Sequence, residues 1–178
     1  MSELVLIKTL DHPDIKSSLP LEAIVGMSVS NEKTAIEHNY RITGHETEER
    51  LSGTDDILGA IADFFHETQV RERDERQSYN CHSFVAYSIG QQSTSRHTGA
   101  SNFKLVDVDT SPSHLEPTIP YGLINSDNEH IHSTIGINRP EYSLGVLGTN
   151  NPLVICANGL LKYLYNARQI REIQCPPY

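Results

Sequence analysis

Short apolar segments rich in β-branched residues recur along the chain, and Pro, Asn or Gly residues bound them, which is typical of strands. The N-terminal third contains three such segments, at residues 4–10, 22–30 and 39–44. The last third contains four in close succession, at residues 121–125, 131–137, 142–148 and 152–156. The turn sequences NSDN, NRPE and TNN separate these four, so we expect an antiparallel meander there.

Other segments have apolar residues three and four positions apart, which predicts helices. These are residues 55–67 with Thr54 as N-cap, a helix from about Asn80 to Gly90, and residues 157–169. Two further strands are expected, at 103–108 and at 170–174, the second as an edge strand. The pattern predicts one α+β domain over residues 1–178, with its core at roughly 54–174 and a β-rich N-terminal extension at 1–50.

The composition narrows the class of protein. The chain has 178 residues, of which 37% are hydrophobic and 21% charged, as in folded globular proteins. Its net charge of −9 is unfavourable for binding nucleic acid, so no nucleic-acid partner is expected. No apolar stretch is long enough for a membrane span, and the N-terminus lacks the pattern of a secretory signal. We therefore expect a cytoplasmic protein, with export by a non-classical secretion route left open.

Cys81 lies in the first turn of the helix predicted to begin near Asn80. The unpaired backbone N–H groups and the helix dipole at that end favour a thiolate, which is a nucleophile. A thiolate of this kind needs a base, and the adjacent His82 points about 100° away around the helix. His132 is the best candidate for the base, because it opens an apolar strand beside small residues.

The segment 80-NCHSFVAY-87 resembles the nucleophile motif of the NlpC-type cysteine peptidases, which cleave bacterial cell-wall peptides. The segment 119-IPYGLINSDNEHIHSTIGI-137 is similar to the second block of that family, which carries the catalytic histidine. The resemblance covers roughly residues 78–156 and implies a papain-like α+β fold, in which an antiparallel sheet packs against the helix that carries the nucleophile. It also implies Cys81 as the nucleophile, His132 as the base, a peptide or cell-wall fragment as the substrate, and no metal or organic cofactor.

That family usually has a third polar residue on the next strand, which orients the imidazole. In this chain the strand reads 142-YSLGVLG-148, with apolar residues in the expected region. We expect Asn150 to take this role, with Asn151, Ser143, a backbone carbonyl or water as alternatives. Toxins delivered into rival bacteria also lack an export signal, so an inhibitory or immunity partner stays open.

Other interpretations of the sequence stay open as well. A binding module of the same fold could have lost the chemistry, or the acyl group could pass to an amine or a lipid instead of water. Alternatively, His130 and His132 are two positions apart, share a strand face, and could bind a metal in a β-barrel protein. Cys156 and Cys175 are expected to be free thiols without a catalytic role, because three widely spaced cysteines predict no disulfide framework.

Overall fold

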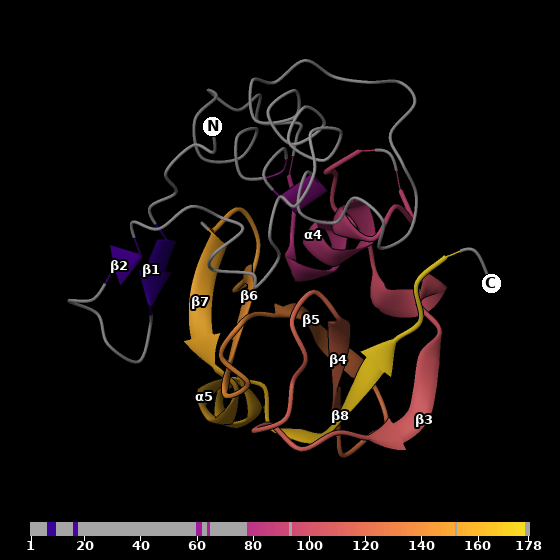
Figure 1. Ribbon diagram of the computed structural model, residues 1–178. Coiled ribbons are helices and arrows are strands. Elements are labelled where there is room, and N and C mark those ends of the chain that lie inside the picture. The colour runs from indigo at the N-terminus through magenta and orange to yellow at the C-terminus, as the bar shows by residue number, and fades with distance from the viewer. Residues whose placement is uncertain are drawn as a thin grey trace, which may run out of the picture.

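The computed structural model describes residues 7–9, 16–17, 60, 61, 64, 78–92, 94–151 and 153–176. Their strands form one sheet in the order β2-β1-β7-β6-β5-β4-β8-β3 (Figure 1). The strands are β1 (Ile7–Thr9), β2 (Lys16–Ser17), β3 (Leu105–Asp109), β4 (Pro120–Asn125), β5 (His130–Gly136), β6 (Tyr142–Val146), β7 (Leu153–Ala157) and β8 (Ala167–Ile173). The segments at 22–30 and 39–44, and most of the predicted N-terminal extension, lie outside the described residues.

The predicted antiparallel meander is confirmed. β4, β5, β6 and β7 follow one another in the sheet as antiparallel neighbours. β8 and β3 extend this antiparallel part beyond β4, whereas β1 runs parallel to β7 at the other end. An antiparallel sheet with a few separate helices makes the chain an α+β protein.

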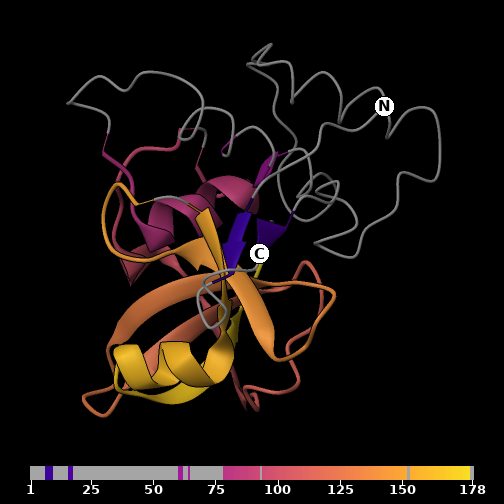
Figure 2. The ribbon, with the colours of Figure 1, turned by 90° about the vertical axis from the view of Figure 1, so that its left-hand side faces the viewer.

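The helices α4 (Cys81–Ser88) and α5 (Asn158–Leu164) lie on opposite faces of the sheet (Figure 2). Because side chains alternate along a strand, each helix packs on its own set of apolar residues. The cluster on the α4 side includes Phe84, Val85, Ile135, Ile137, Leu144, Val146, Leu153 and Ile155. The cluster on the α5 side includes Leu115, Tyr121, Leu123, Cys156, Leu161 and Ile170. Within the described part of the chain, no helix has the length and apolar character that crossing a bilayer requires.

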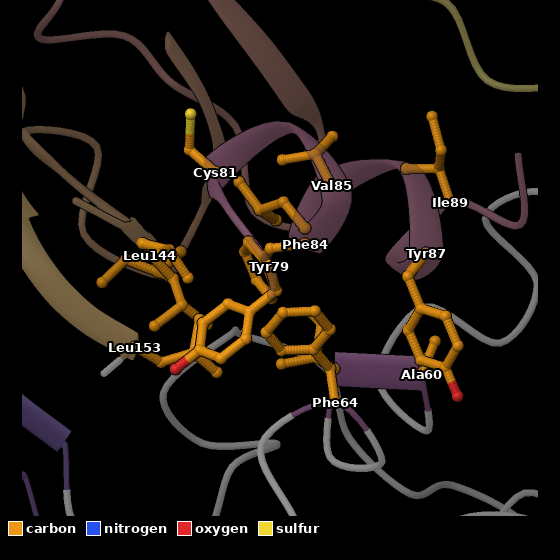
Figure 3. Close-up of a cluster of buried hydrophobic side chains, with 14 of the residues drawn as sticks. Ala60, Phe64, Tyr79, Cys81, Phe84, Val85, Tyr87, Ile89, Leu144 and Leu153 are labelled. Atoms are coloured by element: carbon orange, nitrogen blue, oxygen red, sulfur yellow. The ribbon is translucent and has the colours of Figure 1, made fainter. Parts of the chain in front are cut away.

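Part of the helix predicted at 55–67 is described, and these residues, Ala60, Ile61 and Phe64, are helical and buried. The ring of Phe64 lies edge-on to the rings of Tyr79 and Phe84, at centroid distances of 5.4 and 5.1 Å (Figure 3). Such edge-to-face contacts are favourable between buried aromatic rings. They hold the segment that precedes α4 against the helix, and so help to fix the position of its first turn.

The prediction for the C-terminal region was wrong in two respects. The helix expected over 157–169 ends at Leu164, because Asn166 takes a left-handed conformation with φ of 49° that stops the helical hydrogen bonds. β8 therefore starts at Ala167, and it is not an edge strand. It pairs with β4 on one side and with β3 on the other, because β3 covers the edge that β8 would otherwise leave open.

Gly136 ends β5 at a point where another segment of backbone crosses it. Its N–H donates to the Ile119 carbonyl oxygen (2.9 Å), and a Cβ on Gly136 would overlap the carbonyl oxygen of Glu116. We expect Gly136→Ala to lower the free energy of unfolding by about 1–3 kcal/mol, because backbone must move to relieve the overlap. Urea unfolding measures this loss. Gly159→Ala is the matched control, since a Cβ there meets no atom within 4 Å, and an equal loss in both variants would contradict the prediction.

Candidate active site

Asn80 caps α4, the helix that the sequence predicts to begin near this residue, and fixes the direction of its first turn. The Asn80 side chain accepts a hydrogen bond from the Ser83 N–H (2.9 Å), and the Ser83 hydroxyl accepts one from the Asn80 N–H (2.8 Å). The Asn80 amide group also donates to the Thr98 carbonyl oxygen (2.8 Å). Cys81 is therefore the first helical residue. It is only 6% exposed, and its sulfur points away from the rings of Phe64 and Tyr79 (Figure 3).

The Cys81 sulfur lies where β5 and β6 separate. These two strands pair at Ile135↔Leu144 and Gly136↔Ser143, and among the described residues the earlier part of β5 pairs only with β4. The Ser133 N–H, on the side of β5 that β6 leaves open, faces the Cys81 sulfur, as do the N–H groups of His82 and of Cys81 itself. Three backbone donors thus converge on the sulfur, and such a group of donors stabilises negative charge.

His132 is fully buried, and it precedes Ser133 on β5. Its ring stacks on the ring of Tyr165 at a centroid distance of 4.4 Å, on the sheet face that α5 covers. Cys81 thus lies against Ser133, the residue that follows His132 on β5, whereas the His132 ring lies on the other face of the sheet. Neither ring nitrogen of His132 has a hydrogen-bond partner among the described residues, so no hydrogen bond joins the ring to the Cys81 sulfur.

Burial changes the protonation that the sequence predicts for Cys81. Removal from water raises the pKa of the Cys81 thiol above its usual value of 9.0, and the three backbone N–H groups oppose this only in part. Burial therefore favours the protonated thiol, which opposes the thiolate that the sequence predicts. Burial, followed by the charges of His82 and His130, lowers the pKa of His132 to about 3, so its imidazole is neutral.

Ser133 also links α4 to β5 through two imidazoles. Its hydroxyl lies 2.8 Å from His82 Nδ1 and 2.8 Å from His130 Nε2. The two rings meet edge-on at a centroid distance of 5.2 Å, and Phe103 packs against both. One ring nitrogen can donate to the hydroxyl oxygen while the other accepts the hydroxyl proton, which satisfies all three groups when both imidazoles are neutral. Burial favours that neutral state, because it lowers the pKa of His82 and of His130 to about 4.

The metal-binding interpretation of His130 and His132 meets a geometric obstacle. The pairing of β4 with β5 shifts between Leu123 and Ile124, so that His130 and His132 follow a bulge rather than simple alternation. His130 consequently contacts His82 on the α4 side, whereas His132 contacts Tyr165 on the α5 side. Among the described residues, no three His, Cys, Asp or Glu side chains come together as metal ligands.

Asn150, the expected third residue, binds a different part of the chain. Its side-chain oxygen accepts a hydrogen bond from the Tyr79 N–H (3.0 Å), and its own N–H donates to the Tyr79 carbonyl oxygen (2.9 Å). Asn151, one alternative, donates to the Leu147 carbonyl oxygen, and the buried Ser143 hydroxyl has no partner among the described residues. The loop after β6 thus secures the segment before α4, and the group in contact with the His132 ring is Tyr165.

Sequence reasoning did not identify Ser133 or Tyr165 as parts of the site. Ser133 stands next to His132 in the sequence, but its contacts with His82 and His130 arise only in the folded chain. Tyr165 gave no signal, because it belongs to the turn after α5 and meets His132 only in the folded chain. The other two cysteines form no disulfide within the described part of the chain; Cys156 is buried on β7, and Cys175 is half-buried near the C-terminus.

Comparisons with known proteins do not identify a relative of this chain. No family model matches the chain, and neither the curated proteins nor the solved structures contain a significant match.

Proposed function

We propose that the protein is a cysteine hydrolase that cleaves an amide bond, with Cys81 as the nucleophile and His132 as the base. The observation that carries the proposal is the convergence of three backbone N–H groups on the Cys81 sulfur, one of them from Ser133, which follows the buried His132 on β5. Acyl transfer needs such donors, because negative charge develops on the sulfur and then on the carbonyl oxygen of the substrate. Bacterial cell-wall peptides are the proposed substrate class, supported by the sequence resemblance at 80–87 and 119–137.

The proposed reaction starts from a neutral thiol and a neutral imidazole. With a substrate carbonyl in place, His132 accepts the thiol proton as the sulfur–carbon bond forms, and the carbonyl π electrons move to oxygen. The carbon–nitrogen bond then breaks, and the imidazolium gives its proton to the leaving amine. His132 next takes a proton from water as the water oxygen attacks the thioester. The carbon–sulfur bond then breaks, the carboxylic acid leaves, and the imidazolium returns its proton to the sulfur. Substrate binding has to bring the ring and the sulfur into hydrogen-bond reach, since such contacts tighten in the substrate complex.

The competing proposal is a binding module that has this fold without the chemistry. The raised pKa of the Cys81 thiol and the absence of a hydrogen bond from His132 to any described residue support it. The two proposals differ in one property. A hydrolase carries its acyl group on Cys81 during turnover, whereas a module leaves that thiol unchanged in the presence of its ligand.

The test is to incubate the full chain with soluble peptide fragments of bacterial cell wall. We expect new amine and carboxyl termini in the products by mass spectrometry, and a transient acyl adduct on Cys81 in the intact protein after rapid acid quenching. A parallel reaction uses an activated ester of a simple acyl group. Cys175→Ala is the matched control and should behave as the wild type, because Cys175 lies outside the site.

Each result has a separate meaning. Acylation of Cys81 by the ester without cleavage of cell-wall peptides would keep the cysteine hydrolase and reject the substrate class. Neither cleavage nor acylation would reject the hydrolase and favour the binding module. Cleavage that continues without Cys81 would place the chemistry elsewhere in the chain.

A further inference from the structure

The His132 ring has no polar group to hold its orientation within the described part of the chain. Both of its nitrogens lack a hydrogen-bond partner there, although the residue is fully buried. On the neighbouring strand β6, Gly145 has no side chain, and even a Cβ there would only reach van der Waals contact with His132 Nε2, at 3.7 Å. A base that transfers protons twice per turnover needs a defined orientation, so another kind of contact must supply it.

Tyr165 makes that contact. Its ring lies nearly parallel to the imidazole, with 16° between the planes and 4.4 Å between the centroids. Tyr165 is itself held in place, because its backbone N–H donates to the Leu161 carbonyl oxygen (3.0 Å) and its hydroxyl oxygen faces the Gly148 N–H. The phenol is also close enough to Cys81 for a thiolate there to raise its pKa, after the larger effect of burial, to about 12.

We propose that Tyr165 is the positioning residue for His132, and that it orients the imidazole by ring stacking in place of the polar residue expected on the next strand. This inference rests on the proposed function. Stacking leaves both ring nitrogens free, so one of them can accept the thiol proton and return it to the leaving group. The face of a phenol ring also attracts a cation, and Tyr165 therefore favours the imidazolium that forms after proton transfer.

The phenol acts here as a neutral ring. Its high pKa means that it keeps its proton throughout the neutral range, so it is neither a base nor an anion beside the sulfur. The proposal consequently assigns the effect to the aromatic ring and not to the hydroxyl group. Phenylalanine should replace Tyr165 with little loss, whereas an aliphatic side chain of similar size should not.

The experiment compares Tyr165→Phe, Tyr165→Leu and Tyr163→Leu with the wild type. Tyr163 is the matched control, because it lies two residues away and is 82% exposed. We expect Tyr165→Phe to stay within about twofold of wild-type kcat, and Tyr165→Leu to lose about 10- to 100-fold in kcat with little change in KM, as for a misplaced base. The basic group in the pH profile of kcat should shift to a lower pKa in Tyr165→Leu only, because the imidazolium loses its stacking partner.

A measurement that does not depend on activity accompanies the kinetics. The carbon-bound ring protons of His132 should resonate upfield in the wild type and in Tyr165→Phe, through the ring current of the stacked aromatic, and should return downfield in Tyr165→Leu. Urea unfolding of each variant separates a loss of fold from a loss of position. If Tyr165→Leu fails to fold, Tyr165→Phe and the wild-type ring shifts still decide whether the stack exists.

The outcomes separate this inference from the proposed function. If Tyr165→Leu cleaves as fast as the wild type and has the same pH profile, the role of Tyr165 is overturned and the hydrolase stays intact. An equal loss in Tyr165→Phe and Tyr165→Leu would assign the effect to the hydroxyl and also overturn it. Absence of any cleavage that depends on Cys81 in the wild type would reject the proposed function, and the role of Tyr165 in catalysis with it. If the chemical shifts of the His132 ring protons are the same in the wild type and in Tyr165→Leu, the two rings do not stack.

Discussion

Cys81→Ala should lower kcat for amide cleavage by at least about 10⁴-fold, and His132→Gln by about 10²- to 10⁴-fold. Alanine removes the atom that carries the acyl group, whereas glutamine keeps much of the volume of the imidazole and cannot accept the thiol proton. The two groups act in one step, so the double variant should be no slower than Cys81→Ala alone. Initial rates of product formation, measured by mass spectrometry on the same cell-wall peptides, give all three values.

Cys81 and His132 are both buried, so a loss of activity must be distinguished from a loss of fold. Cys81→Ser keeps the size of the side chain and is a much poorer nucleophile under the same base, so it should be nearly as inactive as Cys81→Ala while unfolding in urea like the wild type. Cys156→Ala is the opposite control. It removes a buried thiol from the other apolar cluster, so it should lower stability and leave the activity in place. Full activity in Cys81→Ala, or additive losses in the double variant, would contradict a Cys81–His132 pair.

The strands of the last third could be predicted from sequence because local pattern determines them. Alternating apolar residues identify four strands, and the Asn- and Pro-containing turns between them leave room only for antiparallel neighbours. The first turn of α4 could be predicted for a similar reason, since an N-cap is a property of a few consecutive residues, here Asn80 to Ser83. These features fix which elements carry Cys81 and His132.

The geometry of the site could not be predicted, because it depends on register and burial. The pairing shift between β4 and β5 sends His130 and His132 to different neighbours, and the one-residue change is invisible in the alternation of the strand. The early separation of β5 from β6 exposes the Ser133 N–H to the sulfur. Sequence arguments on Cys81 considered the helix dipole, which lowers a thiol pKa, but not the larger effect of burial, which raises it.

The protein should lose stability steeply as the pH falls from about 7 to about 4, because three imidazoles are folded in their neutral form. Burial lowers the pKa of His82 and His130 to about 4 and that of His132 to about 3, whereas all three have a value near 6.5 in the unfolded chain. Between these values the unfolded state binds protons that the folded state does not, so the free energy of unfolding falls as the pH falls. Each unit of difference in pKa corresponds to about 1.4 kcal/mol. We expect a total loss of several kcal/mol, measured by urea unfolding at a series of pH values.

Single substitutions identify the groups responsible for this dependence. His130→Gln keeps an amide that can bond to the Ser133 hydroxyl but cannot take up the proton, so the slope of stability against pH should become shallower between pH 7 and pH 4. His114→Asn is the control, because this histidine is exposed and takes no part in the contacts at Ser133. A protein that is equally stable at pH 4 and pH 7, or a slope that His130→Gln leaves unaltered, would mean that these imidazoles do not need to be neutral in the folded state. In that case charged His82 and His130 would have to coexist beside Ser133, and the arrangement that joins α4 to β5 would depend on some other set of contacts.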